Sequence, residues 1–248
     1  MYFLMITAFI IIVPIIVITI RIKKNVSPYE TIFESIVLTA IVVIAVLFSA
    51  YFDSGVSLGE QLMSAVREAA EVFAGIDEFV KAAGIGDLTY DERVTLIVSA
   101  YGMINSMLPS TVIIAGTFIS YFLYMAISKM YKSIGGRPAE LIPLKFFRWP
   151  RNTMAGFLVM FVLSFAIGML PAFEDAQLYM NISIIFEFVI AIQGLGFVFL
   201  LFDLKKIPKV FAVLIGIVGM ATSFGRMTLF VVGALDYMIN MRGRIVRR

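Results

Sequence analysis

The chain has 248 residues, of which 61% are hydrophobic and 15% are charged. Soluble domains are about 45–50% apolar, so this composition is typical of an integral membrane protein. The chain has no cysteine and no histidine, which excludes disulfides, thiolate nucleophiles and His-based metal sites. Its net charge of +3 comes from bases at the ends of apolar runs, a pattern that topology explains better than nucleic-acid binding does.

The first apolar run covers residues 2–20, and about 20 apolar residues are enough to cross a bilayer. No basic residue precedes this run, whereas three follow it in the turn 21–24. The positive-inside rule therefore places the N-terminus outside and this turn inside. A second span over 32–52 returns outward, behind a capping box that Ser27 and Glu30 are expected to form.

An acidic segment, 57–107, follows and is expected to lie outside the membrane. Ser57 and Thr89 each precede a glutamate at the capping-box spacing. Within 57–83, apolar residues recur every three or four positions, which predicts one amphipathic helix on the outer surface, ended by Gly84. This helix could also cover a vestibule or bind a partner helix. Its predicted stripe is Leu58, Leu62, Ala65, Ala69, Phe73, Ile76, Val80 and Ala83.

The rest of the chain alternates between apolar runs and charged loops. Pro109 divides the long run after Thr89, because the residue before a proline avoids the α region. Glu174 and Asp175 are expected to form an acidic external turn. The last two runs are short, and we count each as a span because the arginine-rich C-terminus would otherwise lie outside. The later spans are predicted at 108–128, 154–173, 178–202, 210–223 and 227–241.

The sequence therefore predicts an all-α, polytopic transmembrane bundle of about six or seven spans. It forms a single membrane domain over 1–248, with the N-terminus outside and the C-terminus inside.

The loop 129–152 is strongly basic, with six bases against one acid, Glu140. Such a loop is typical of the cytoplasmic side. Aromatic rings alternate with its bases, a pattern that suits the lipid headgroup layer or the docking of a protein partner. The candidates for lipid or partner contact in this loop are Arg137, Arg148, Trp149 and Arg151.

Glu187 is the most informative single residue, because a carboxylate well inside a span is costly. It is predicted to bind a solute or carry a proton, although a hydrogen-bonded structural carboxyl would explain it too. Gln193 and Gly194 could expose backbone to a ligand, and close helix packing explains the glycine equally well. Asn105 and Asn181 are candidates for an outer entrance.

The last predicted span carries Asp236, Asn240 and Arg244 at spacings of four. This spacing predicts a structural ion pair at the inner interface. Asp236 and Arg242 are further candidates for contact with lipid or with a partner.

Several motifs, in this order and spacing, resemble the YybS-like family of uncharacterised bacterial multi-pass membrane proteins. They are Gly136-Arg137-Pro138, the run from Pro143 to Pro150, Gln193-Gly194, Pro208 and Gly233…Asp236…Arg242. The family is similar in outline to MreD, an envelope-shape protein, and to the substrate-binding S subunits of energy-coupling-factor vitamin transporters. Its members carry further apolar segments ahead of the position of Met1. The resemblance implies a protein of the bacterial cytoplasmic membrane.

No P-loop, G-x-S-x-G or H-E-x-x-H motif occurs in the sequence, so we predict no enzymatic activity and no cofactor or metal. The leading prediction is a solute-binding or transport-related subunit without its own ATPase. The alternative is a non-enzymatic scaffold that binds other envelope proteins through the basic loop or the acidic external segment. The expected partners are the lipid bilayer and a possible protein partner, and no nucleic acid.

Overall fold

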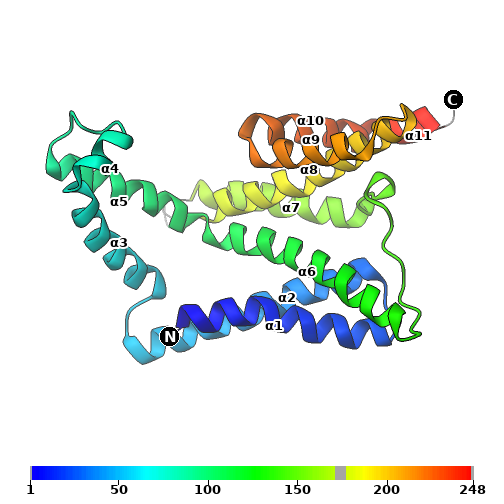
Figure 1. Ribbon diagram of the computed structural model, residues 1–248, viewed down its shortest axis with the longest axis horizontal. Coiled ribbons are helices and arrows are strands. Elements are labelled where there is room, and N and C mark those ends of the chain that lie inside the picture. Colours follow the sequence, from blue (N-terminus) through cyan, green and yellow to red (C-terminus); the bar gives the residue numbers. More distant parts are fainter. Residues whose placement is uncertain (1, 171–176, 247–248) are drawn as a thin grey trace. The chain divides into compact units, whose positions relative to one another are not determined.

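The computed structural model describes residues 2–170 and 177–246, and within these ranges every regular element is a helix (Figure 1). Five described helices are long and apolar enough to cross a membrane. The all-α polytopic prediction is therefore confirmed. These helices are α1 (Tyr2–Lys23), α2 (Pro28–Ser54), α6 (Leu108–Ser133), α7 (Arg151–Gly168) and α8 (Leu178–Leu204). The predicted acidic turn at Glu174 and Asp175 lies outside the described residues.

The last two predicted spans form a bent pair. Helices α9 (Lys209–Ala221) and α10 (Ser223–Ile239) have 13 and 17 residues, or about 20 and 26 Å, against about 30 Å for a hydrocarbon core. Their axes bend by 109° at the break between them. The described residues thus hold five candidate spans, or six if the pair counts as one, against the six or seven predicted.

The chain divides into two compact units, 1–139 and 140–248. In the first unit, α1, α2 and α6 pack together and bury a set of small hydroxyl side chains. Such residues let membrane helices approach closely. The Tyr124 hydroxyl donates to the Ala139 carbonyl oxygen at 2.9 Å and so holds the chain that follows α6. The buried hydroxyl residues are Thr31, Ser35, Thr39, Ser110 and Ser120.

The segment between α2 and α6 folds as α3 (Leu58–Ala74), α4 (Asp77–Ala82) and α5 (Tyr90–Ser106). The prediction of one helix over 57–83 is wrong, because the helix breaks at Gly75. The predicted apolar stripe is also shifted. Ala70 and Ala74 are buried against Ile97 of α5, whereas Phe73 is 41% exposed. The small alanines allow α5 to approach and leave the larger rings on the open side.

The helix boundaries agree well with the signals in the sequence. Ser57 and Thr89 both form complete capping boxes, and α6 begins directly before Pro109. Gly84 takes the left-handed conformation with φ +69°. Ser27 accepts from the Glu30 amide at 3.3 Å, but the predicted return bond from the Glu30 side chain is not formed.

The two complete capping boxes predict a pH dependence. Hydrogen bonds from the Ser57 side chain and backbone lower the pKa of Glu60, and those from the Thr89 backbone and side chain lower the pKa of Glu92. A carboxylate with a lowered folded-state pKa stabilises the fold above its unfolded pKa of about 4.3, and this stabilisation is lost as the pH falls through the folded pKa. We therefore expect the first turns of α3 and α5 to fray in acid. Hydrogen exchange of these amides at neutral and acidic pH, corrected for intrinsic rates, measures this effect. The first turn of α2 is the control, since its cap has no carboxylate bond, and an equal change there would contradict the prediction.

Candidate functional site

The second unit is organised around α8, the most buried of the candidate spans. Helix α10 runs parallel to it, because Glu187 of α8 pairs with Arg226 near the start of α10, while Gln193 bonds to Asp236 near its end. Gly194 of α8 lies against Leu229 and Gly233 of α10. A Cβ added to Gly194 would lie 1.9 Å from the Leu229 carbonyl oxygen, and one added to Gly233 would lie 2.1 Å from the Ile190 carbonyl oxygen. The two backbones are therefore in direct contact through glycine.

Helix α9 runs in the opposite direction along α8 (Figure 1). It starts next to the end of α8, and Gly216 further along lies against Leu195 and Phe199. Helices α9 and α10 therefore form a hairpin that starts and finishes at the Leu204 end of α8. The sequence predicted two spans here, and the two helices turn by 109° between them.

A buried ion pair lies where α10 meets α8. Asp236 is 1% exposed and Arg242 is 9% exposed, and the Arg242 Nε lies 2.8 Å from Asp236 Oδ2. The same carboxylate accepts from Gln193 Nε2 and from the Arg242 backbone amide, both at 3.2 Å. Asp236 is therefore held by three groups from the chain itself.

The other guanidinium nitrogens of Arg242 bind backbone carbonyl oxygens. Nη1 donates to Lys145 and Phe147 at 3.1 and 2.6 Å, and Nη2 donates to Gln193 at 2.7 Å. Burial lowers the pKa of Arg242, and the charge of Asp236 opposes this change. Gly196 leaves room for this arrangement, since a Cβ there would lie 2.6 Å from the Leu144 carbonyl oxygen.

The aromatic part of the basic loop is attached to the same place. Gln193 Oε1 accepts from the Trp149 backbone amide at 3.3 Å, and Trp149 Nε1 donates to the Val189 carbonyl oxygen at 2.8 Å. Arg148 donates to Asn240 Oδ1 at 2.9 Å. We call Gln193, Asp236, Arg242 and Trp149 the buried network. Its polar groups bond to one another and to nearby backbone, so its geometry is that of a structural clamp.

These contacts correct two predictions. Asp236 pairs with Arg242, six positions on, and not with Arg244 at helical spacing, because α10 ends at Ile239 and the chain turns through Asn240 at φ +50°. Asp236 and Arg242 are buried and so do not present a surface to lipid or to a partner. Arg137, Arg148 and Arg151 are exposed, as their predicted role requires.

Glu187 has a different environment. Its Oε1 lies 3.9 Å from Nε of Arg226 on α10, and the two side chains are 40% and 45% exposed. The Ser183 hydroxyl, one turn before Glu187, is buried and has no hydrogen-bond partner among the described residues. We call Ser183, Glu187 and Arg226 the open charge pair site. The sequence had singled out Glu187, but nothing in it indicated that Arg226 is its partner.

The two asparagine candidates lie in different units. Asn181 is 8% exposed and donates to the Gln177 carbonyl oxygen at 2.9 Å, within the first turn of α8. Asn105 is half-buried beside Gly59, in the other unit. Across the described residues, no three acidic side chains gather closely enough to hold a metal ion.

Comparisons with known proteins agree with the resemblance in the motifs. A family model described as "Predicted membrane protein (DUF2232)" matches residues 2–237. The chain is 22% identical over 194 residues to the uncharacterized protein YybS of Bacillus subtilis (strain 168), an alignment that covers 77% of this chain and 60% of that protein. The chain thus spans less than two thirds of this relative's length. No solved structure matches. The further similarity to MreD and to transporter S subunits is not confirmed.

Proposed function

Because the chain belongs to the DUF2232 family of predicted membrane proteins, we propose that it is a solute-binding or transport-related subunit without its own ATPase. The observation that carries this proposal is the open charge pair site. Two opposite charges lie 3.9 Å apart on α8 and α10 of the second unit, and both side chains remain substantially exposed.

The contrast with the buried network supports this choice. Asp236 and Arg242 are fully occupied by each other, by Gln193 and by backbone groups. Glu187 and Arg226 have only a long contact with each other among the described side chains. A charged group inside a span is costly unless it is paired or functional. The loosely paired charges are therefore the ones that a solute can reach and bind.

The chemistry of the site limits the class of solute. A ligand would need a cation or hydrogen-bond donor for Glu187 and an anion or acceptor for Arg226. The Ser183 hydroxyl can donate or accept one further bond. A small zwitterionic or amide-bearing solute meets these requirements. No side chain at the site supplies a nucleophile with an adjacent base, so we propose binding and not catalysis.

The hairpin is compatible with the proposed orientation. Lys205 and Lys209 lie at its start, and Arg242 and Arg244 lie at its end. Both ends therefore carry positive charge, which favours the cytoplasmic side for both under the positive-inside rule. Five complete spans followed by such a hairpin would leave the N-terminus outside and the C-terminus inside the cytoplasmic membrane.

Replacing Glu187 with glutamine tests the proposal, because the amide keeps the shape and most hydrogen bonds but removes the charge. A thermal-shift screen of amino acids, amides and vitamins should identify a solute that raises the melting temperature of the purified protein. We expect Glu187→Gln to lower the affinity for this solute by about 10- to 100-fold, as for the loss of a charge-assisted hydrogen bond. Asp203→Asn is the matched control, because Asp203 is an exposed carboxylate at the end of α8. This variant should bind the solute with the affinity of the wild type. Unchanged affinity in Glu187→Gln would contradict the assignment.

The alternative, a scaffold for envelope proteins, is favoured by one observation. Outside the candidate spans, α3, α4 and their junction expose a group of large apolar side chains, and exposed apolar patches of this kind often bind proteins or membrane surfaces. This second function would be favoured if the screen finds no solute and if a partner protein binds the wild type but not the Phe79→Ser variant. The exposed residues are Val72 (64%), Phe73 (41%), Ile76 (37%) and Phe79 (36%).

A further inference from the structure

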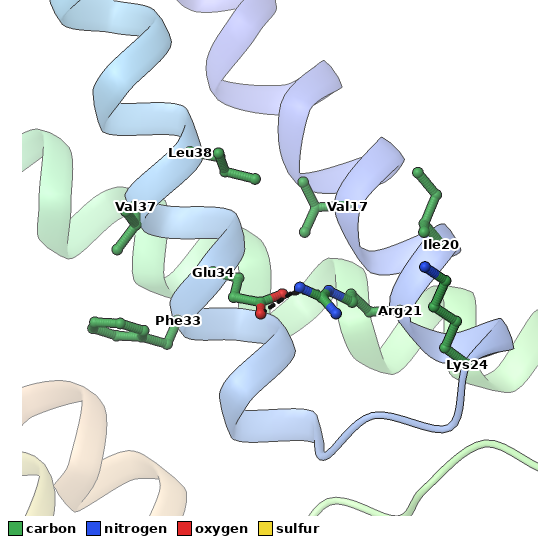
Figure 2. Close-up of a pocket in the computed structure, with 8 residues that line it drawn as sticks. All are labelled: Val17, Ile20, Arg21, Lys24, Phe33, Glu34, Val37 and Leu38. Atoms are coloured by element: carbon green, nitrogen blue, oxygen red, sulfur yellow. Dashed lines mark hydrogen bonds and ion pairs between the residues drawn. The ribbon is translucent and has the colours of Figure 1, made fainter.

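A groove of about 510 Å³ lies between the end of α1 and the start of α2 in the first unit (Figure 2). It joins a basic end, formed at the turn between the two helices, to an apolar wall that continues along both of them. Four apolar side chains of the wall are exposed by 39–63%. They are Ile20 on α1 and Phe33, Val37 and Leu38 on α2.

The charges at the basic end are not equivalent. Arg21 and Glu34 face each other across the groove, with Nε–Oε2 and Nη2–Oε1 distances of 2.5 Å. This bidentate pair neutralises the arginine. Lys24 is exposed, and no described side chain pairs with it. Figure 2 shows its side chain running back along α1 toward Ile20. The groove therefore carries one uncompensated positive charge directly beside its apolar wall.

We propose that this groove binds one anionic phospholipid, with the headgroup phosphate on Lys24 and an acyl chain along the apolar wall. The basic turn ends two candidate spans, which places it at the level of the lipid headgroups. Anionic lipids are attracted to lysine at this level. A soluble anion would satisfy Lys24 but leave Phe33, 63% exposed, uncovered. A phospholipid matches both parts of the groove.

Native mass spectrometry of the purified full chain tests this proposal, by titration with dioleoylphosphatidylglycerol and with dioleoylphosphatidylcholine. We expect the wild type to prefer the anionic lipid. Lys24→Gln should weaken the binding of phosphatidylglycerol by about five-fold and weaken that of phosphatidylcholine less, because the choline of that lipid already balances its phosphate. Lys23→Gln is the matched control, because Lys23 is also exposed and adjacent but does not line the groove. Thermal unfolding should be the same for both variants.

Two further measurements separate the contribution of the headgroup from that of the acyl chain. Leu38→Ala should weaken the binding of both lipids by a similar factor, since it removes apolar wall area and no charge. Inorganic phosphate at millimolar concentration should not displace phosphatidylglycerol. The proposal is overturned if Lys24→Gln behaves like Lys23→Gln, if the wild type has no preference for the anionic lipid, if Leu38→Ala leaves both lipids unaffected, or if phosphate alone competes.

Discussion

Asp236→Asn is expected to lower the stability of the second unit by about 3–5 kcal/mol, as for the loss of one partner of a buried ion pair. Asp236 is 1% exposed, accepts hydrogen bonds from Gln193 and from the Arg242 amide, and forms an ion pair with the Arg242 guanidinium. Without the carboxylate, the buried charge of Arg242 has no counter-ion. Thermal unfolding of the purified protein should show a decrease in melting temperature of about 6 °C or more.

Two comparisons make this result specific. The Lys145–Asp203 pair, at 2.7 Å, is 29% and 42% exposed, so Asp203→Asn should cost about 0–1 kcal/mol. Replacing both buried partners, as in Asp236→Leu with Arg242→Met, removes both charges, and should recover much of the stability lost in Asp236→Asn. If Asp236→Asn and Asp203→Asn cost the same, Asp236 does not hold a buried charge in the folded protein.

Gly233→Ala is expected to separate α8 from α10. The added Cβ would lie 2.1 Å from the Ile190 carbonyl oxygen and 2.8 Å from the Gly194 amide nitrogen. These are backbone atoms that no rotamer change can move, so one helix must shift. Overpacking of this kind costs about 1–3 kcal/mol, or more where the backbone must move. We expect a clear loss of melting temperature.

The shift should also be visible at the network, because Gln193 and Asp236 adjoin the contact. Trp149 lies on the same network, and it is the single tryptophan of the chain, so its fluorescence should change in Gly233→Ala. Gly156→Ala on α7 is the matched control, since a Cβ there would meet nothing within 4 Å. A neutral Gly233→Ala, equal to Gly156→Ala, would contradict the direct backbone contact.

The sequence was most informative where the signals are local. Ser57 and Thr89 define helix starts through hydrogen bonds over three residues, and Pro109 divides α5 from α6 because of a steric clash with its immediate neighbour. The spans follow from the same kind of evidence, since about 20 apolar residues must cross the membrane wherever they occur. The prediction of one helix over 57–83 failed, because the break at Gly75 and the burial of Ala70 depend on where α5 packs.

For the candidate site residues too, the sequence indicated the residues themselves but not their contacts. The sequence could select Glu187, Gln193 and Asp236, because polar groups in apolar runs are costly and therefore conspicuous. It selected Trp149 and Arg242 for another role, contact with lipid or with a partner. It could not assign their partners. Helical spacing favoured Asp236 with Arg244, whereas the turn through Asn240 presents Arg242 instead. The pairing of Glu187 with Arg226 depends on the parallel register of α8 and α10.

The sequence by itself thus determined the all-α membrane class, the capped and proline-marked helix starts, and the polar residues that need partners. These follow from solvation and from contacts within a few residues. Only the tertiary structure decided which of these residues are mutually satisfied, as in the buried network, and which remain open, as at Glu187 and Arg226. The reason is physical. Hydrogen bonds and ion pairs act over about 3–4 Å, and the distance between two helices far apart in the chain depends on how their side chains pack, here on a glycine in each helix at the point of contact.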